Sequence, residues 1–111
     1  MIKTRQDGTE LTVYLHGEID HCIAQSIRDE IETILRKSRI MHLILDFNQV
    51  SFMDSSGIGM IIGRYKTVSS YGGEVSAVGL HPSISRLFHI AGLHRILKTH
   101  ENQKEMKTND D

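Results

Sequence analysis

The sequence lacks the features that mark several specialised classes of protein. Its 111 residues include one cysteine, Cys22, so no internal disulfide can form and a disulfide-stapled scaffold is excluded. It has no excess of positive charge, because 14 acidic residues oppose 13 basic ones, which argues against general binding to nucleic acids or anionic membranes. Its most apolar stretch, residues 57–63, is far too short to span a bilayer, and residues 1–7 contain no signal-peptide core. We therefore expect one small cytoplasmic domain.

The first half of the chain changes from a two-residue to a helical repeat of apolar positions. Strands are expected at residues 2–6 and 11–15, joined by a turn at Asp7-Gly8 and ended by Gly17. Asp20 then stands where a helix N-cap is expected, before four isoleucines and Leu35 at helical spacing over residues 23–35. Residues 42–47 are a short apolar run, which predicts a strand covered on both faces.

The second half continues as alternating helices and strands. The expected elements are a helix with an apolar stripe at Ile58, Ile61, Ile62, Tyr65 and Val68, a strand over 75–80, a helix from Pro82 to a C-cap at Gly92, and a short strand at 96–97. In the third helix, Ile84, Leu87, Phe88 and either Ile90 or Ala91 are expected to point inward. Residues 1–100 then form one domain of order β-β-α-β-α-β-α-β in the α/β class, with parallel pairing from residue 42 onward. Residues 101–111 form a polar tail or a short helix.

The glycines at the start of the second helix raise the alternative of a small nucleotide- or ligand-binding domain. Gly57 and Gly59 fit the first two places of a dinucleotide fingerprint, but the third place is occupied by Ile62, and Gly63 lies one position late. No Gly-Lys-Ser or Gly-Lys-Thr sequence is present, which excludes a P-loop. The plainer interpretation is that Gly59 and Gly63, which have no side chains, allow one face of the helix to pack closely against a neighbouring element.

Hydrolytic and metal chemistry find little support in the sequence. Ser55 has Gly57 after it but Met53 before it, so half of the nucleophile-elbow motif is missing. The seven histidines include no pair spaced i, i+4 and no His-Glu-x-x-His motif, so we expect no metal site and no cofactor: His16, His21, His42, His81, His89, His94 and His100.

The segment Asp54-Ser55-Ser56-Gly57 has two interpretations. In the first, an Asp or Ser oxygen simply caps the helix that follows. In the second, a serine here is a regulated one, because a helix N-terminus tolerates a phosphate of about −1.5 to −2 charge. Asp54, and Asp20 across the loop, would add negative charge beside it. The added charge raises the free energy of the free protein little, but it raises the free energy of a complex much more, because like charges repel more strongly in an interface. A binding switch requires this difference.

Two segments resemble a known family. Gly17-Glu18-Ile19-Asp20 after a strand, and the segment 52–59 at the next strand-to-helix turn, resemble the STAS domain of bacterial anti-sigma factor antagonists. The likeness covers about residues 2–98. Residues 63–66, 72–74 and 86–88 bring it closest to the antagonists of the anti-sigma-F factor of endospore formers.

The resemblance implies a mixed sheet of four to five strands, with helices mainly on one face, in a protein that is a monomer when free and is not an enzyme. It implies that Ser55 is phosphorylated by a partner that is both anti-sigma factor and serine kinase. It further implies that the unmodified form binds this partner and releases the sporulation sigma factor, and that a serine phosphatase restores that form. The partner contacts carried over by the resemblance are Asp20, His21, Asp54, Ser56, Gly57, Ile58 and Gly59. The sister antagonists of the general stress pathway share the Asp-Ser-Ser-Gly core, so that pathway, or a scaffold role in a larger stress assembly, is an alternative.

Overall fold

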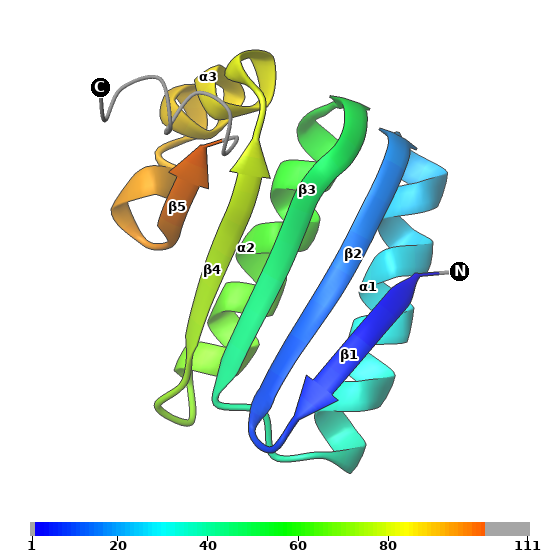
Figure 1. Cartoon of the computed structure of the whole chain (residues 1–111), viewed down its shortest axis with the longest axis vertical. Helices are drawn as coiled ribbons and strands as arrows, with labels where there is room; N and C mark the ends of the chain where they lie inside the picture. Colours follow the sequence, from blue (N-terminus) through cyan, green and yellow to red (C-terminus); the bar gives the residue numbers. More distant parts are fainter. Residues whose placement is uncertain (1, 102–111) are drawn as a thin grey trace.

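The alternating pattern at the start of the chain forms a β-hairpin (Figure 1). In the computed structural model, which describes residues 2–101, β1 (Lys3–Asp7) pairs antiparallel with β2 (Glu10–Ile19). Gly8 adopts a φ of 62° in the two-residue turn, a conformation that glycine takes without steric cost. The prediction that Gly17 ends β2 is wrong. Gly17 has a φ of 76° and lies at a shift of register with the next strand, so it forms a bulge and β2 continues to Ile19.

The remaining strands pair in parallel and complete a mixed five-stranded sheet of order β1-β2-β3-β4-β5. The other elements are α1 (His21–Lys37), β3 (His42–Met53), α2 (Ser55–Ser69), β4 (Glu74–Leu80), α3 (Pro82–Ala91), the 3-10 helix η1 (Leu93–Arg95) and β5 (Lys98–Glu101). The predicted α/β class and element order are therefore confirmed. The last strand lies two residues later than the predicted 96–97 because Leu93–Arg95 forms η1 before it.

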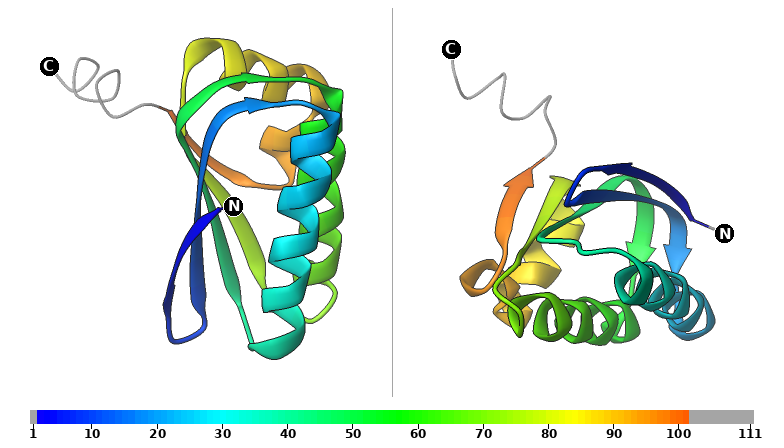
Figure 2. Two further views of the ribbon diagram at one scale, coloured as in Figure 1. Left: turned by 90° about the vertical axis from the view of Figure 1, so that its right-hand side faces the viewer. Right: turned by 90° about the horizontal axis from the view of Figure 1, so that it is seen from below.

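The helices cover one face of the sheet (Figure 2). The parallel strands follow one another in a single direction across the sheet, and right-handed crossovers then place every connecting helix on the same side. The expectation that residues 42–47 are covered on both faces is therefore wrong. Leu43, Leu45 and Phe47 are buried toward the helices, whereas Ile44 and Asp46 on the other face are only partly buried.

The buried helix faces differ from the predicted stripes in two places. In α2 the buried residues are Gly57, Met60, Ile61, Arg64 and Val68, while Ile58, Ile62 and Tyr65 lie partly buried beside the core. This rotation follows from the packing of α2 against both the sheet and α1, which Figure 2 shows running beside it. In α3, Ile84 and Phe88 are buried, but Leu87 is only partly so. Ile90 is 78% exposed and Ala91 is also exposed, because α3 lies across one end of the sheet and presents only one narrow face to it.

Three further features complete the described chain. Phe47 of β3 and Phe88 of α3 pack edge to face, with ring centroids 5.5 Å apart, and join α3 to the core. No helix within residues 2–101 is long and apolar enough to cross a membrane. Of the predicted polar tail, Glu101 belongs to β5, and residues 102–111 lie outside the described residues.

Candidate functional site

The ends of two neighbouring parallel strands bring the predicted site residues together. Ile19 at the end of β2 is in register with Met53 at the end of β3, and the Asp54 N–H donates to the Ile19 carbonyl at 3.3 Å. Asp20 and Asp54, which follow these residues, therefore lie at the same edge of the sheet. In parallel α/β sheets this carboxyl edge is where ligands and partners commonly bind.

Both aspartates cap the helix that begins after them. Asp20 Oδ1 accepts from the Ile23 N–H at 3.0 Å at the start of α1, and Asp54 Oδ1 accepts from the Ser56 N–H at 2.8 Å at the start of α2. The predicted cap at Asp20 is confirmed, and of the two residue types proposed for the second cap, it is an aspartate that provides it. Each carboxylate satisfies an N–H that the helix itself cannot bond.

Ser55 is the first residue of α2 and is exposed. Among residues 2–101, its hydroxyl makes no hydrogen bond or ion pair, since the cap at this helix end is made by the neighbouring aspartate. The first turn of a helix carries unpaired N–H groups and a partial positive charge, both of which favour a negative group. The geometry thus presents an accessible hydroxyl at a place where a phosphate is tolerated.

Three of the other predicted residues line one shallow groove. His21 from α1, with Ser56 and Gly59 from α2, border a groove of about 320 Å³ between the N-terminal halves of the two helices. Ile58 lies partly buried on α2.

Gly59 is exposed, and a Cβ built on it or on Gly63 would meet nothing within 4 Å in the described chain. The interpretation that these two glycines allow close approach of a neighbouring element is therefore wrong.

Gly57 has a different setting from Gly59. It is buried, and a Cβ built on it would overlap the Cγ and Sδ atoms of Met53. Its missing side chain is thus required by packing inside the protein. Gly57 allows the first turn of α2 to pack against Met53, and it is not exposed to a partner.

Sequence reasoning missed two apolar side chains that flank the site. Phe52, two residues before Asp54, is 52% exposed, and Ile23 in the first turn of α1 is 43% exposed. Exposed aromatic residues such as Phe52 are enriched at protein interfaces. The signal for Phe52 was present in the motif of residues 52–59. Ile23 belongs to the apolar stripe of the predicted helix, so the sequence predicted that it would be buried.

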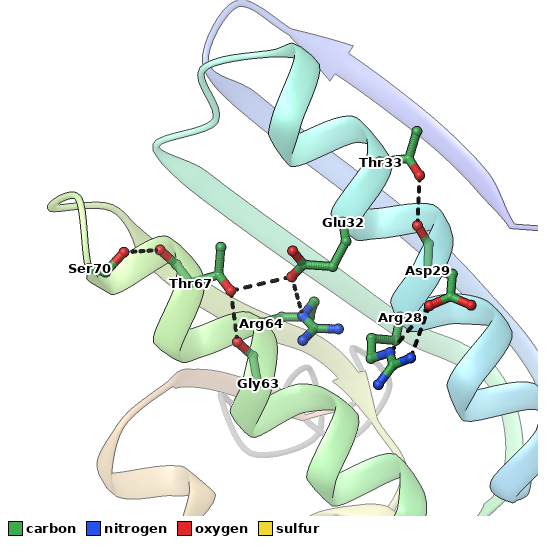
Figure 3. A network of polar contacts seen from close by, with 8 residues as sticks. All are labelled: Arg28, Asp29, Glu32, Thr33, Gly63, Arg64, Thr67 and Ser70. Atoms are coloured by element: carbon green, nitrogen blue, oxygen red, sulfur yellow. Dashed lines mark hydrogen bonds and ion pairs between the residues drawn. The ribbon is translucent and has the colours of Figure 1, made fainter.

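An ion pair between a buried arginine of α2 and a partly buried glutamate of α1 joins the two helices beyond the groove (Figure 3). Arg64 Nε of α2 lies 2.9 Å from Glu32 Oε2 of α1, and the Thr67 hydroxyl lies 3.3 Å from the same carboxylate oxygen. The Arg64 side chain is 9% exposed, and burial lowers the pKa of its guanidinium from the usual value, while the Glu32 carboxylate opposes the shift. This pair fixes the two helices that carry the site relative to each other.

His42 has the neighbours that a hydrolytic triad would need, but its serine is buried. His42 Nε2 lies 2.8 Å from the Ser76 hydroxyl and its Nδ1 lies 3.6 Å from Glu10 Oε2, an acid–histidine–serine order. However, Ser76 is only 5% exposed, so its oxygen is closed to a substrate. Residues 2–101 contain no cluster of three or more His, Cys, Asp or Glu side chains that would hold a metal ion.

Comparisons with known proteins agree with this geometry. The model of the STAS domain family matches residues 1–106. The anti-sigma F factor antagonist of Paenibacillus polymyxa is 34% identical over 93 residues, which cover 84% of this chain and 80% of that protein. The anti-sigma-B factor antagonist of Listeria monocytogenes is 33% identical over 109 residues, 98% of this chain and 94% of that one.

A solved structure supports the fold independently. The anti-sigma factor antagonist SpoIIAA in its unphosphorylated form superposes with a TM-score of 0.81 at 23% sequence identity, covering 99% of this chain and 96% of that one. At this identity the likeness concerns the fold: a mixed five-stranded sheet with helices on one face.

Proposed function

Since the chain belongs to the STAS domain family, we propose that it is an anti-sigma factor antagonist that is switched by phosphorylation of Ser55. In its unmodified form the protein binds the anti-sigma factor, and the sigma factor is released. The chain is the substrate of this regulation rather than a catalyst. Phosphoryl transfer, with its metal ion and base, belongs to a kinase activity of the partner.

The exposure of Ser55 is the observation that carries this proposal. The hydroxyl stands at the first residue of α2, unbonded within the described chain and open to a kinase. A hydroxyl held in a hydrogen bond or covered by side chains would have to be released before it could react.

Charge at the interface explains how one phosphate prevents binding. On the free protein, the N-terminus of α2 and solvent both accommodate the added charge. In a complex, that charge and the carboxylate of Asp54 beside it face the partner with less water between them. Two like charges about 4 Å apart repel by about 1 kcal/mol in water and about 4 kcal/mol in a partly desolvated contact. The phosphate therefore opposes docking without unfolding the helix.

The contact surface surrounds Ser55 on the edge formed by the ends of β2 and β3. It includes Asp20, His21, Ser56, Ile58 and Gly59, to which the exposed Phe52 is added. Gly57 acts within it by holding the first turn of α2 against Met53.

We assign the protein to the sporulation sigma-factor pathway, with a serine phosphatase restoring the unmodified form. The motif residues outside the Asp-Ser-Ser-Gly core favour the anti-sigma-F antagonists. Sequence identity does not separate the two pathways, since the F-type and B-type relatives are 34% and 33% identical to this chain. The general stress pathway is therefore the second candidate. Binding measured against both anti-sigma factors of the source organism decides between them, because the pathway's own partner binds more tightly.

Intact-mass spectrometry tests the switch directly. The protein is incubated with ATP, magnesium and the anti-sigma factor, and the mass gain is mapped by peptide fragmentation. We expect one phosphate on Ser55, no gain in Ser55→Ala, and one phosphate at the end of the reaction in the matched control Ser56→Ala, even if its rate changes because Ser56 borders the contact surface. A phosphate that persists in Ser55→Ala, or its loss only in Ser56→Ala, contradicts the proposal.

A further inference from the structure

The outer edge of β2 is open along its last residues. β1 pairs with β2 only from Asp7 opposite Glu10 to Lys3 opposite Tyr14, whereas β2 continues to Ile19. In the described chain, no strand lies beside residues 16–18 on this side, because β1 is the terminal strand of the sheet (Figure 1). An unpaired strand edge is a ready template for an extended segment of another chain.

A groove of about 280 Å³ runs between this edge and α1. Leu15 of β2 and Ile27 of α1 form its buried floor, and the 43% exposed Ile23 forms part of its wall. Side chains of a strand alternate between its two faces, so a segment added to the β2 edge would direct every second side chain toward the helix side. The floor fits a branched aliphatic side chain in that position.

The charges around the groove are acidic. Glu18 and Glu30 lie among its lining residues, which include no lysine or arginine, and Glu30 Oε1 accepts from the N–H of Ile2, another lining residue, at 3.4 Å, so Glu18 is the acidic group that faces an incoming segment. Glu18 is exposed and has no ion pair in the described part of the chain. Asp20, two residues after Glu18, accepts from the N–H of Ile23, so the groove lies at the same end of β2 as the residues that precede the Ser55 surface.

We propose that the edge of β2 at residues 16–18, with the groove beside Ile23, binds an extended segment of the anti-sigma factor. This segment carries a branched aliphatic side chain next to lysine or arginine residues, which face Glu18. The inference rests on the proposed function, because it extends the contact surface of the same partner. This contact differs from the one at Ser55. The segment binds the groove mainly through apolar and backbone contacts, and these do not depend on whether Ser55 is phosphorylated.

Two isoleucines provide a matched test. Ile23→Ser removes the groove wall, while Ile90→Ser removes an isoleucine that is 78% exposed on α3, away from the groove (Figure 1). Both are made in Ser55→Ala, and affinity for the anti-sigma factor is measured by calorimetry after circular dichroism has shown equal folding. We expect Ile23→Ser to bind about tenfold more weakly, as for an interface anchor, and Ile90→Ser to bind within about twofold of the parent. Equal affinities for the two variants overturn the proposal.

Backbone hydrogen exchange tests strand addition separately from the apolar contact. We expect those amides of residues 16–18 that face the open edge to exchange more slowly in the complex than in the free protein, because an added strand bonds to this edge. Unchanged exchange there contradicts strand addition and indicates another kind of occupant, such as a helix. If Ser55→Ala binds neither anti-sigma factor, the proposed function itself fails. If it binds and only the Ile23 effect is absent, the failure is limited to the groove.

Discussion

Asp20 and Asp54 cap two neighbouring helices from the ends of two paired strands. The Asp54 N–H donates to the carbonyl of Ile19, the residue that precedes Asp20, and each carboxylate accepts an N–H from the helix that follows it. One hydrogen-bonded edge thus sets the starts of both α1 and α2. Ser55 is the first helical residue after this edge, so its position is fixed by the backbone, while its hydroxyl makes no hydrogen bond to any of residues 2–101.

Asp54→Ala should lower the free energy of unfolding by about 1 kcal/mol, because the Ser56 N–H loses its acceptor. Asp54→Asn is the matched control, since its side-chain oxygen still accepts that hydrogen bond, and we expect a loss of less than about 0.5 kcal/mol. Urea denaturation followed by circular dichroism measures both. An alanine variant as stable as the parent would show that the cap does not hold the start of α2.

Two glycines in the same helix should respond in opposite directions to alanine. In Gly57→Ala the new methyl group overlaps the buried Met53 side chain, so we expect a loss of about 1 kcal/mol after the gain in helix propensity is counted. In Gly59→Ala the methyl group meets nothing within 4 Å, so we expect a gain of about 0.5–1 kcal/mol. Thermal unfolding distinguishes the two, and a shift of both in the same direction contradicts the packing described.

Gly59→Ala also separates stability from binding. Because Gly59 borders the groove between α1 and α2, its methyl group should weaken binding of the anti-sigma factor while it stabilises the fold. Titration calorimetry on the same samples provides the comparison. Unchanged affinity would place Gly59 outside the contact surface.

The ion pair between Arg64 and Glu32 predicts an asymmetric response to substitution. Glu32→Gln removes the charge that offsets the buried guanidinium, and we expect a loss of about 2 kcal/mol. Arg64→Met removes the buried guanidinium and leaves the Glu32 carboxylate, which is 22% exposed and can be hydrated, so we expect a smaller loss of about 1 kcal/mol. Denaturant titration of both variants measures the difference. A Glu32→Gln protein that unfolds at the same denaturant concentration as the parent would show that the pair does not join the helices.

The sequence predicted the order of elements, the caps and the Gly92 helix end because each depends on a few adjacent residues. Gly92 has the expected left-handed φ of 78°. The errors arose where a distant element decides the outcome. The alternating burial of residues 43–47 depends on the side to which the crossovers return. Arg64 is buried although the predicted apolar stripe of α2 does not include it, and its burial depends on Glu32 from another helix.

In the candidate site, too, local features were predicted correctly and features that depend on distant elements were not. The motif placed Asp54 and Ser55 at a strand-to-helix turn, and its own residues explain that placement. The motif contains Phe52, but its 52% exposure, like the 43% exposure of Ile23 in α1, depends on which side chains of other elements cover it in the folded chain.

The affinity of the anti-sigma factor for the unmodified and the Ser55-phosphorylated protein, measured side by side, tests the central claim most directly. Repulsion of about 1–4 kcal/mol between the phosphate and facing charge predicts binding weaker by about five- to several-hundred-fold after phosphorylation, with the circular dichroism spectrum unchanged. Equal affinity of the two forms would contradict the account.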